Sequence, residues 1–249
     1  MTRIIAVANQ KGGVGKTTTA VNLAASLAAA ERKTLLIDAD PQGNATSGVG
    51  IQSESIHSSL YDAIAGDATL AEVVIPSVNF KTLDVVPATQ DLVGAEVELV
   101  NRQHREFVMQ KTLRGFAGRY EYVLIDCPPS LGMLTLNMLT AAHSILIPIQ
   151  CEYYALEGLS KLLNTITLVQ QNCNAALAIE ECSSRCTTRD SISQSRLPSR
   201  RRNISLDRCT ARSFRVTSVW QRRRVLESRF CFTTCNRLAR NAISPSRKN

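Results

Sequence analysis

A cluster of glycine, lysine and threonine residues near the start of the chain has the composition of a loop that binds phosphate. The segment NQKGGVGKTTT spans residues 9–19 and places three glycines directly before a Lys-Thr pair. Glycines have no Cβ, so successive backbone N–H groups can turn toward an anion. In such a loop the lysine reaches the β- and γ-phosphates, and the hydroxyl of the next residue ligates Mg²⁺. The predicted phosphate-binding residues are Gly12, Gly13, Val14, Gly15, Lys16, Thr17 and Thr18.

This loop departs from the common G-x-x-x-x-G-K-[ST] pattern in two ways. Gln10 stands where the first glycine would be, and Lys11 is a second lysine that the pattern does not need. A glycine turn without a ligand is the alternative interpretation. The order of apolar segment, glycines, Lys-Thr and helix-forming segment favours the phosphate loop.

Acidic residues follow two further apolar segments. Asp38 and Asp40 come at the end of KTLLIDAD, and Asp126 follows YVLI. A buried acid is costly unless it serves a cation or a polarised water, although each of the first two alone could be a solvated acid at a strand end. Asp126 has the position of an acid that holds Mg²⁺ through its water shell. Cys127 has no base placed beside it, so we predict that it only packs.

Five short apolar segments must position these residues. We predict strands over residues 3–9, 33–40, 81–88, 120–130 and 144–150, with helices over 17–30 and most of 92–116 and a loop over 41–48. Apolar strands alternating with helices predict an α/β fold, a doubly wound and mostly parallel sheet with helices on both faces. The loops after the strands then meet at one edge, where ligands bind.

The composition and the first residues of the chain predict the cellular location of the protein and the redox state of its cysteines. The chain has 249 residues, contains no run of 18 or more apolar residues, and begins without the pattern of a signal peptide. We therefore expect a cytoplasmic protein with no membrane contact. Its eight cysteines are expected to be reduced thiols.

The charge is divided unevenly along the chain. Residues 1–180 contain 12 Lys and Arg against 17 Asp and Glu, a net charge of −5, whereas residues 181–249 contain 17 against 4, a net charge of +13. Sixteen of the 17 basic residues in this tail are arginine, and five of the eight cysteines lie there. The chain therefore changes character near Glu180.

The motifs of residues 2–180 resemble those of the ParA-type chromosome and plasmid partition ATPases. The resemblance rests on KGGVGKTT, LLIDADPQGNATSG, YVLIDCPPSLGMLTLNML and IPIQCEYYALEGLSKLL. These ATPases belong to the deviant-Walker group of P-loop NTPases, which also includes MinD-like proteins. The resemblance implies ATP and Mg²⁺ as cofactors and an ATP-bound homodimer.

The resemblance also implies roles for individual residues. The catalytic residues would be Lys11, which crosses the dimer interface to the partner's nucleotide, Lys16 on the phosphates, and Asp40, which helps to position the attacking water. Thr17, Asp38 and Asp126 would form the magnesium site, partly through water. The implied partners are a ParB-type centromere-binding protein, which stimulates hydrolysis, and non-specific DNA, so a nucleoid-associated location is expected.

The resemblance stops at Glu180, after which the family would supply another strand, a basic DNA-binding surface and an adenine-binding loop. Residues 181–249 instead read ECSSRCTTRDSISQSRLPSRRR and onward, with neither helical nor strand periodicity. An arginine-rich arm for nucleic acid is one interpretation. The other is a single-base deletion: codons compatible with EECSSRCTTRD regroup in the adjacent frame to encode GVLLTMYDA. We expect a ParA-like domain over 1–180, C-terminally incomplete, and an irregular or disordered out-of-frame tail over 181–249.

Three rival interpretations compete with the partition ATPase, and zinc binding is a further interpretation of the tail cysteines. The product could be a non-functional remnant that keeps only part of the nucleotide site. A MinD-like membrane-cycling ATPase would need a C-terminal amphipathic helix, which the tail does not contain. An iron–sulfur reductase would need paired cluster cysteines, which Cys127 and Cys151 do not match. The C-x₃-C pairs of the tail superficially suggest zinc, but out-of-frame codons explain them better.

Overall fold

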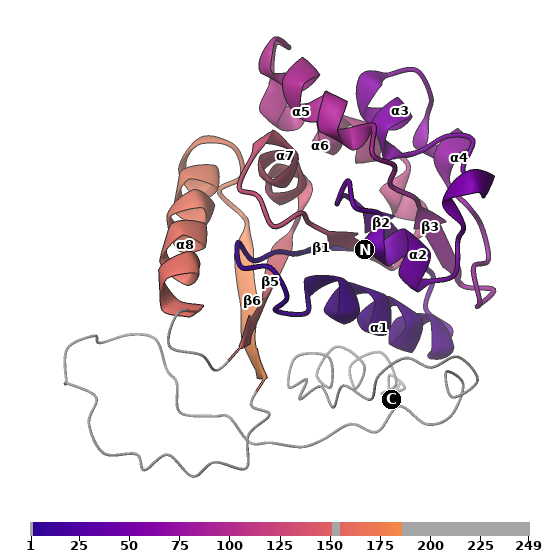
Figure 1. The fold of residues 1–249 in the computed structure, drawn as a ribbon, viewed down its shortest axis with the longest axis horizontal. Coiled ribbons are helices and arrows are strands. Elements are labelled where there is room, and N and C mark those ends of the chain that lie inside the picture. Colours follow the sequence, from indigo (N-terminus) through magenta and orange to yellow (C-terminus); the bar gives the residue numbers. More distant parts are fainter. Residues whose placement is uncertain (1, 151–154, 186–249) are drawn as a thin grey trace, which may run out of the picture.

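The computed structural model describes residues 2–150 and 155–185, over which strands and helices alternate (Figure 1). The strands are β1 (Arg3–Val7), β2 (Thr34–Asp38), β3 (Leu83–Val86), β4 (Tyr122–Asp126), β5 (Ser144–Gln150) and β6 (Ala178–Arg185). The α-helices are α1 (Lys16–Ala29), α2 (Asn44–Gly48), α3 (Leu60–Ala65), α4 (Leu70–Val73), α5 (Leu92–Val100), α6 (Val108–Leu113), α7 (Met133–Ala141) and α8 (Ala155–Asn172). Three short 3₁₀ turns are η1 (Ser53–Ser55), η2 (Arg105–Phe107) and η3 (Ala117–Arg119).

The strands form one sheet in the order β3-β2-β4-β1-β5-β6, and all neighbouring strands are parallel. An isolated antiparallel bridge joins Ile75 to Val85. The predicted α/β class with a mostly parallel sheet is therefore confirmed. Because the strands are parallel, their carboxyl ends lie along one edge, and the register aligns Val7 and Asp38 with Asp126.

Alternate residues of the strands pack into two separate cores. In β1, Ile5 and Val7 contribute to the core beneath α1, together with Leu23 and Leu27 of that helix. Ile4 contributes to the larger core on the opposite face, which helices α3 to α8 cover (Figure 1). The two-residue period of a strand places successive side chains on opposite faces, so apolar residues at every position suit a sheet covered on both sides.

The structure departs from the predicted elements in three places. The segment 41–48, predicted as loop, contains α2, and the long helix predicted over 92–116 is interrupted between α5 and α6, where His104 has a φ angle of 53°. A helix cannot continue through a left-handed residue. The third departure is β6, which no pattern predicted.

The expectation that no strand follows Glu180 is wrong for residues 181–185, because β6 runs to Arg185 and pairs in parallel with β5. The backbone N–H and C=O groups along the edge of β5 pair with an extended segment laid beside them. This pairing outweighs the weak strand preference of residues 181–185. The rest of the predicted tail, residues 186–249, lies outside the described residues. Within the described part, no helix is long and apolar enough to cross a membrane.

Candidate nucleotide site

The glycine-rich loop joins the end of β1 to the start of α1, and its glycines give it a backbone shape that suits an anion. Gly13 and Gly15 have φ angles of 73° and 89°, a conformation that glycine adopts without a Cβ clash. Gly15 caps α1, and no side chain of the described residues accepts a hydrogen bond from the first turn. A Cβ built on Gly12 or Gly13 would meet no atom within 4 Å, so the loop surface is open there. The helix start is thus suited to phosphate.

Asn9, which the sequence analysis did not single out, anchors this loop to the sheet. The buried Asn9 side chain donates from Nδ2 to the carbonyl oxygen of Pro148 in β5, at 2.7 Å. Its Oδ1 accepts a hydrogen bond from the backbone N–H of Lys11, at 3.0 Å. One amide therefore fixes where the loop leaves β1 and holds it against the neighbouring strand.

Lys16 begins α1 and lies among acidic residues. Its side chain is only 7 % exposed, and burial lowers the pKa of its ammonium below the ordinary value. The negative charges of Asp126 and Asp40 act in the opposite direction on that pKa. A buried cation at a helix start, next to open N–H groups, attracts an anionic ligand.

Asp126 ends β4 as a buried carboxylate without a hydrogen-bond partner. The residue is fully buried, and neither Oδ1 nor Oδ2 has a partner among the described residues. Burial raises the pKa of Asp126 to about 7, and the charges of Asp38 and Asp40 add to that rise. The Thr17 hydroxyl and the Lys16 ammonium lie near enough to lower it, although the Thr17 contact falls outside hydrogen-bond geometry.

Asp38, beside Asp126 in the register, is in contrast fully hydrogen-bonded. Its Oδ2 accepts from the backbone N–H and the hydroxyl of Thr46, at 2.7 and 2.8 Å, and its Oδ1 accepts from the N–H of Asp40, at 3.1 Å. Burial raises the pKa of Asp38, while the hydrogen bonds from Thr46 and Asp40 lower it. A fully buried residue is not the solvated acid that the sequence allowed as an alternative. Asp38 positions α2 and the loop that carries Asp40.

The remaining predicted residues lie on the same edge of the sheet. Asp40 is 7 % exposed and accepts a hydrogen bond from the N–H of Gln42, at 3.0 Å. Lys11 is half-buried on the loop, Val14 is buried, and Thr18 is half-buried in the first turn of α1. The structure thus brings the glycine loop and all three acids together. The role of Lys11 across an interface concerns a second chain and stays a prediction.

The residues present fit a magnesium ion held mainly by substrate and water. Within the described residues, no group of three or more His, Cys, Asp or Glu side chains forms a metal cluster of its own. Mg²⁺ in nucleotide sites typically takes one or two protein oxygens and completes its shell with phosphates and waters. The unpartnered oxygens of Asp126, with the Thr17 hydroxyl nearby, supply that limited protein share.

Cys127 does not take part in this chemistry. Its side chain is fully buried, and its Sγ lies 3.9 Å from the carbonyl oxygen of Ile125. Burial raises the pKa of the Cys127 thiol, so the reactive thiolate is disfavoured. The interpretation of Cys127 as a packing residue agrees with this environment.

Comparison with known proteins agrees with a nucleotide site in this fold. Residues 2–179 match the AAA domain family. The chain is 61 % identical over 178 residues to the chromosome partitioning protein ParA of Myxococcus xanthus, covering 72 % of this chain and 62 % of that protein. It is 54 % identical over 180 residues to the sporulation initiation inhibitor protein Soj of Bacillus subtilis, covering 72 % of this chain and 71 % of Soj. The chain therefore spans less than two thirds of the Myxococcus relative.

Solved structures agree with the fold and with a nucleotide site. A cobyrinic acid a,c-diamide synthase from Mycobacterium smegmatis, with a bound ATP analogue and magnesium, superposes with a TM-score of 0.71 at 41 % identity, covering 74 % of this chain and 75 % of that one. A plasmid partition protein from Borrelia burgdorferi B31, bound to AMPPNP, gives a TM-score of 0.62 at 28 % identity and covers 72 % of each chain. With the geometry of the glycine loop and its acids, these matches show that the chain belongs to the AAA domain family and, within it, to the ParA- and Soj-type partition ATPases.

Proposed function

We propose that this protein is a partition ATPase that binds ATP with Mg²⁺ and hydrolyses it to ADP and phosphate. The observation that carries the proposal is the unpartnered, buried carboxylate of Asp126 beside the open glycine loop and Lys16. A fold does not retain such a carboxylate for stability, because an unpaired buried charge is costly. A cation that arrives with a nucleotide would pair with the Asp126 carboxylate and offset this cost.

We assign roles to the residues according to their positions. The N–H groups of the loop and the Lys16 ammonium hold the phosphates, and Thr17 and Asp126 hold Mg²⁺, with Asp38 acting through water because its oxygens already accept protein hydrogen bonds. Bound Mg²⁺ neutralises charge on the phosphate oxygens. Asp40, anchored by its bond from Gln42, orients the attacking water.

In the cycle that we propose for the whole protein, Lys11 of one subunit acts on the nucleotide bound by the other subunit. A cation supplied in trans neutralises the γ-phosphate only when two ATP-bound chains face each other, so ATP holds the dimer together and hydrolysis releases it. The dimer binds DNA non-specifically through surface charge, and a ParB-type partner stimulates hydrolysis. The protein acts in the cytoplasm on the nucleoid.

Hydrolysis of ATP by the full chain, measured with Mg²⁺ and with or without DNA, tests the proposal. Lys16→Ala should weaken ATP binding by about tenfold or more, since charge-assisted hydrogen bonds to phosphate are lost. Lys11→Ala should keep binding by the monomer but lose ATP-dependent dimerisation in sedimentation. Lys33→Ala, at an exposed lysine away from the loop, is the matched control.

A remnant that binds phosphate but does not turn over is the second candidate. The observation in its favour is that the match to the AAA domain family ends at residue 179. Turnover that depends on Mg²⁺ and disappears in Lys16→Ala would exclude the remnant. Equal, metal-independent background in the wild type and in Lys16→Ala would instead exclude the ATPase.

A further inference from the structure

Residues 127–132 connect Asp126, at the end of β4, to the start of helix α7. This loop is attached at both ends. The N–H of Cys127 donates to a carbonyl oxygen of β1, at 3.1 Å, and the Thr135 hydroxyl of α7 donates to the carbonyl oxygen of Ser130, at 2.6 Å. The end of the loop is therefore tied to the first turn of α7. The position of that turn decides how the chain leaves Asp126.

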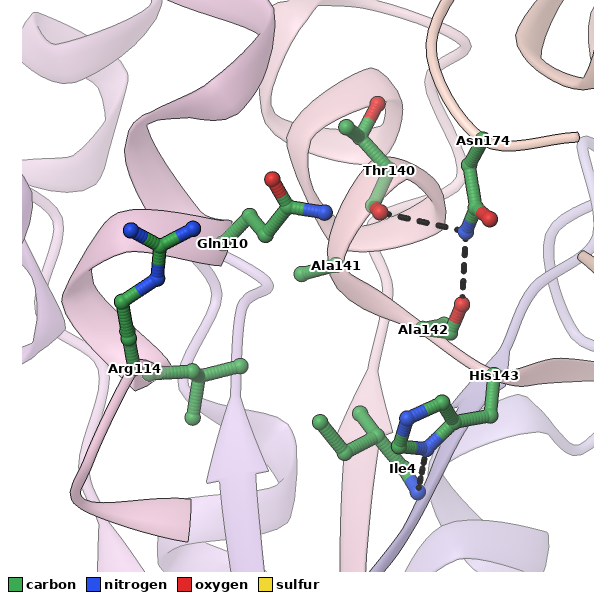
Figure 2. A pocket seen from close by; sticks show the side chains of 9 residues that line it. Ile4, Gln110, Arg114, Thr140, Ala141, Ala142, His143 and Asn174 are labelled. Atoms are coloured by element: carbon green, nitrogen blue, oxygen red, sulfur yellow. Dashed lines mark hydrogen bonds between the residues drawn. The ribbon is translucent and has the colours of Figure 1, made fainter. Parts of the chain in front are cut away.

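The rest of α7 is held by hydrogen bonds to other elements. The Asn174 side chain donates from Nδ2 to three carbonyl oxygens at the end of the helix, those of Leu139, Thr140 and Ala142, at 3.2, 3.1 and 2.7 Å. Figure 2 shows two of these bonds as dashed lines. In the middle of α7, the buried Asn137 side chain accepts from a backbone N–H of α6, at 3.1 Å, and donates to a carbonyl oxygen of η2, at 2.8 Å. Movement of α7 is therefore easiest at its start.

The start of α7 packs against the carboxyl group of Glu96, which comes from α5. A Cβ built on Gly132, the residue that caps α7, would lie 3.1 Å from Cδ of Glu96 and would overlap its Oε1. Gly132 has a φ angle of −82° and a ψ angle of −166°, an extended conformation that any residue can adopt. Glycine at position 132 therefore makes room for the Glu96 carboxyl group and is not required by the backbone.

This carboxyl group lies beside the positive end of a helix, yet its Oε1 is unsatisfied. Oε1 of Glu96 is buried, and no donor in the described part of the chain bonds to it. Nor does any side chain there cap the first turn of α7. The first N–H groups of a helix have no partner within it and attract negative charge. A buried acceptor without a donor is costly, so an unsatisfied acceptor and unsatisfied donors lie next to each other.

We propose that Glu96 is a positioning residue of the nucleotide site, a role that rests on the ATPase activity proposed above. In the nucleotide-bound state the start of α7 closes on Glu96, whose Oε1 accepts a hydrogen bond from the first turn. This bond fixes residues 127–132 and so holds the Asp126 carboxylate in place. The distribution of unsatisfied groups supports the proposal, because the other buried side-chain oxygens without a partner in residues 2–150 and 155–185 belong to Gln10 of the glycine loop and to Asp126 itself.

Steady-state hydrolysis of ATP with Mg²⁺ by the full chain tests the positioning role. Glu96→Gln keeps the shape of the side chain and removes its charge. It should lower kcat about tenfold and change KM less than about threefold, because the glycine loop and Lys16 still hold the phosphates. Glu98→Gln is the matched control on the same helix, since the Glu98 carboxyl group accepts from the Tyr61 hydroxyl instead. An equal kcat in Glu96→Gln and the wild type overturns the proposal.

A double-mutant cycle tests the contact between α5 and α7. Gly132→Ala forces the carboxyl group away and should lower both kcat and the urea concentration at the unfolding midpoint. In a Glu96→Ala chain the space is free, so the same change should have a much smaller effect on both quantities. Gly118→Ala is the control, because a Cβ at Gly118 meets no atom within 4 Å. Equal effects of Gly132→Ala in the two backgrounds overturn the contact.

Amide hydrogen exchange gives a readout that does not depend on turnover. With ATPγS and Mg²⁺, the amides of residues 131–133 should gain protection in the wild type and in Glu98→Gln, and about tenfold less protection in Glu96→Gln. Protection of residues 12–15 reports nucleotide binding in the same samples. Protection of residues 12–15 without any gain at 131–133, or an equal gain in Glu96→Gln, overturns the positioning role alone. Absence of protection in both segments overturns the nucleotide site, and the positioning role with it.

Discussion

Asp38 and Asp126 stand side by side in the register of β2 and β4, yet their surroundings differ completely. Asp38 accepts three hydrogen bonds from the protein, whereas Asp126 accepts none from the residues that the structure describes. Burial raises the pKa of both carboxyls. Hydrogen bonds from Thr46 and Asp40 offset part of the rise at Asp38, and the nearby Thr17 hydroxyl and Lys16 ammonium offset part of it at Asp126. Asp38 organises the fold around the site, and Asp126 keeps its oxygens available for a ligand.

Replacement of Asp126 by asparagine should stabilise the protein when no ligand is bound. The folded-state pKa of about 7 lies above the ordinary 3.8, so the folded state holds the proton more tightly than the unfolded chain does. The contribution of this group to stability is present at low pH and is lost as the pH rises through about 7. Ionisation then costs up to about 4 kcal/mol, at 1.36 kcal/mol for each pKa unit.

Urea unfolding at about pH 5 and about pH 8 measures this effect. The gain in unfolding free energy from Asp126→Asn should be larger at the higher pH, and stabilisation by Mg²⁺ with ATP should disappear. A variant that is less stable than the wild type at both pH values would contradict the assignment.

Replacement of Asn9 by alanine should loosen the glycine loop. The change leaves the carbonyl of Pro148 and the N–H of Lys11 without their partner, at a cost of about 1–3 kcal/mol. Thermal unfolding measures the loss, and ATP affinity should fall with it. Asn22→Ala is the control, because the Asn22 side-chain amide donates to the carbonyl of Thr18 within α1 and to no other group in the described part of the chain.

At the scale of elements, α2 shows how a carboxylate can create a helix that composition does not favour. Its sequence, NATSG, contains residues that prefer turns, and Gly43 before it has a φ angle of 63°. The Thr46 hydroxyl donates to Asp38 and accepts from the N–H of Ala88, at 3.0 Å, so one side chain joins α2 to β2 and to the segment after β3. Tertiary contacts therefore decide the local structure.

In the Thr46→Val variant, α2 should therefore be less stable and should unfold locally more often than in the wild type. Valine keeps the shape but removes one of the two hydrogen bonds to Oδ2 of Asp38 and leaves the N–H of Ala88 unsatisfied, at about 1–3 kcal/mol. Thr46→Ser retains the hydroxyl and should lose much less. Hydrogen exchange of the amides in α2 distinguishes the two, and equal protection in both variants would show that the hydroxyl is unimportant.

The sequence predicts most of the site because its chemistry lies in short local patterns. The glycine loop and the strand-end acids are visible as motifs, and the five predicted strands all occur, with ends that differ from the prediction by at most four residues. The contacts of Asn9 with Pro148 and of Thr46 with Asp38 and Ala88 are not predictable in this way. They join segments that follow or belong to different strands, with Thr46 in α2. The proximity of these segments depends on the strand order, and a single sequence does not specify that order. For the same reason β6 was missed, since its pairing with β5 outweighs its composition.

At the scale of the whole molecule, an acidic domain is joined to a strongly basic segment. Residues 1–180 carry a net charge of −5 and residues 181–249 one of +13. An out-of-frame origin of the tail does not alter its charge, and charge alone suffices for non-specific binding to nucleic acid. We therefore predict that the charge of the tail binds DNA independently of the partition cycle proposed above.

Deletion of residues 186–249 should abolish ATP-independent binding to random DNA. The full chain should bind at low salt and lose affinity steeply as salt rises, because its arginines displace counterions from the phosphates. Fluorescence anisotropy with a labelled duplex at several salt concentrations measures the slope. Retention of the same slope after the deletion would place the binding surface in the domain.

The coding DNA gives an independent check on the tail. If a base was lost at Glu180/Glu181, the adjacent frame should encode GVLLTMYDA immediately afterwards, followed by further family-like sequence. An adjacent frame without such a sequence would rule out the deletion and favour an arginine-rich arm that belongs to the protein.

The strand order also has a consequence for how the protein folds. β1 is made first, yet it lies between β4 and β5, and the register joins Arg3 to Tyr122. Its hydrogen-bonding partners therefore emerge from the ribosome only after most of the domain has been synthesised. Contacts of such large sequence separation form slowly, because the intervening loop must close first. The glycine loop is thus among the first segments to be synthesised, and it acquires its acidic neighbours only when β4 docks.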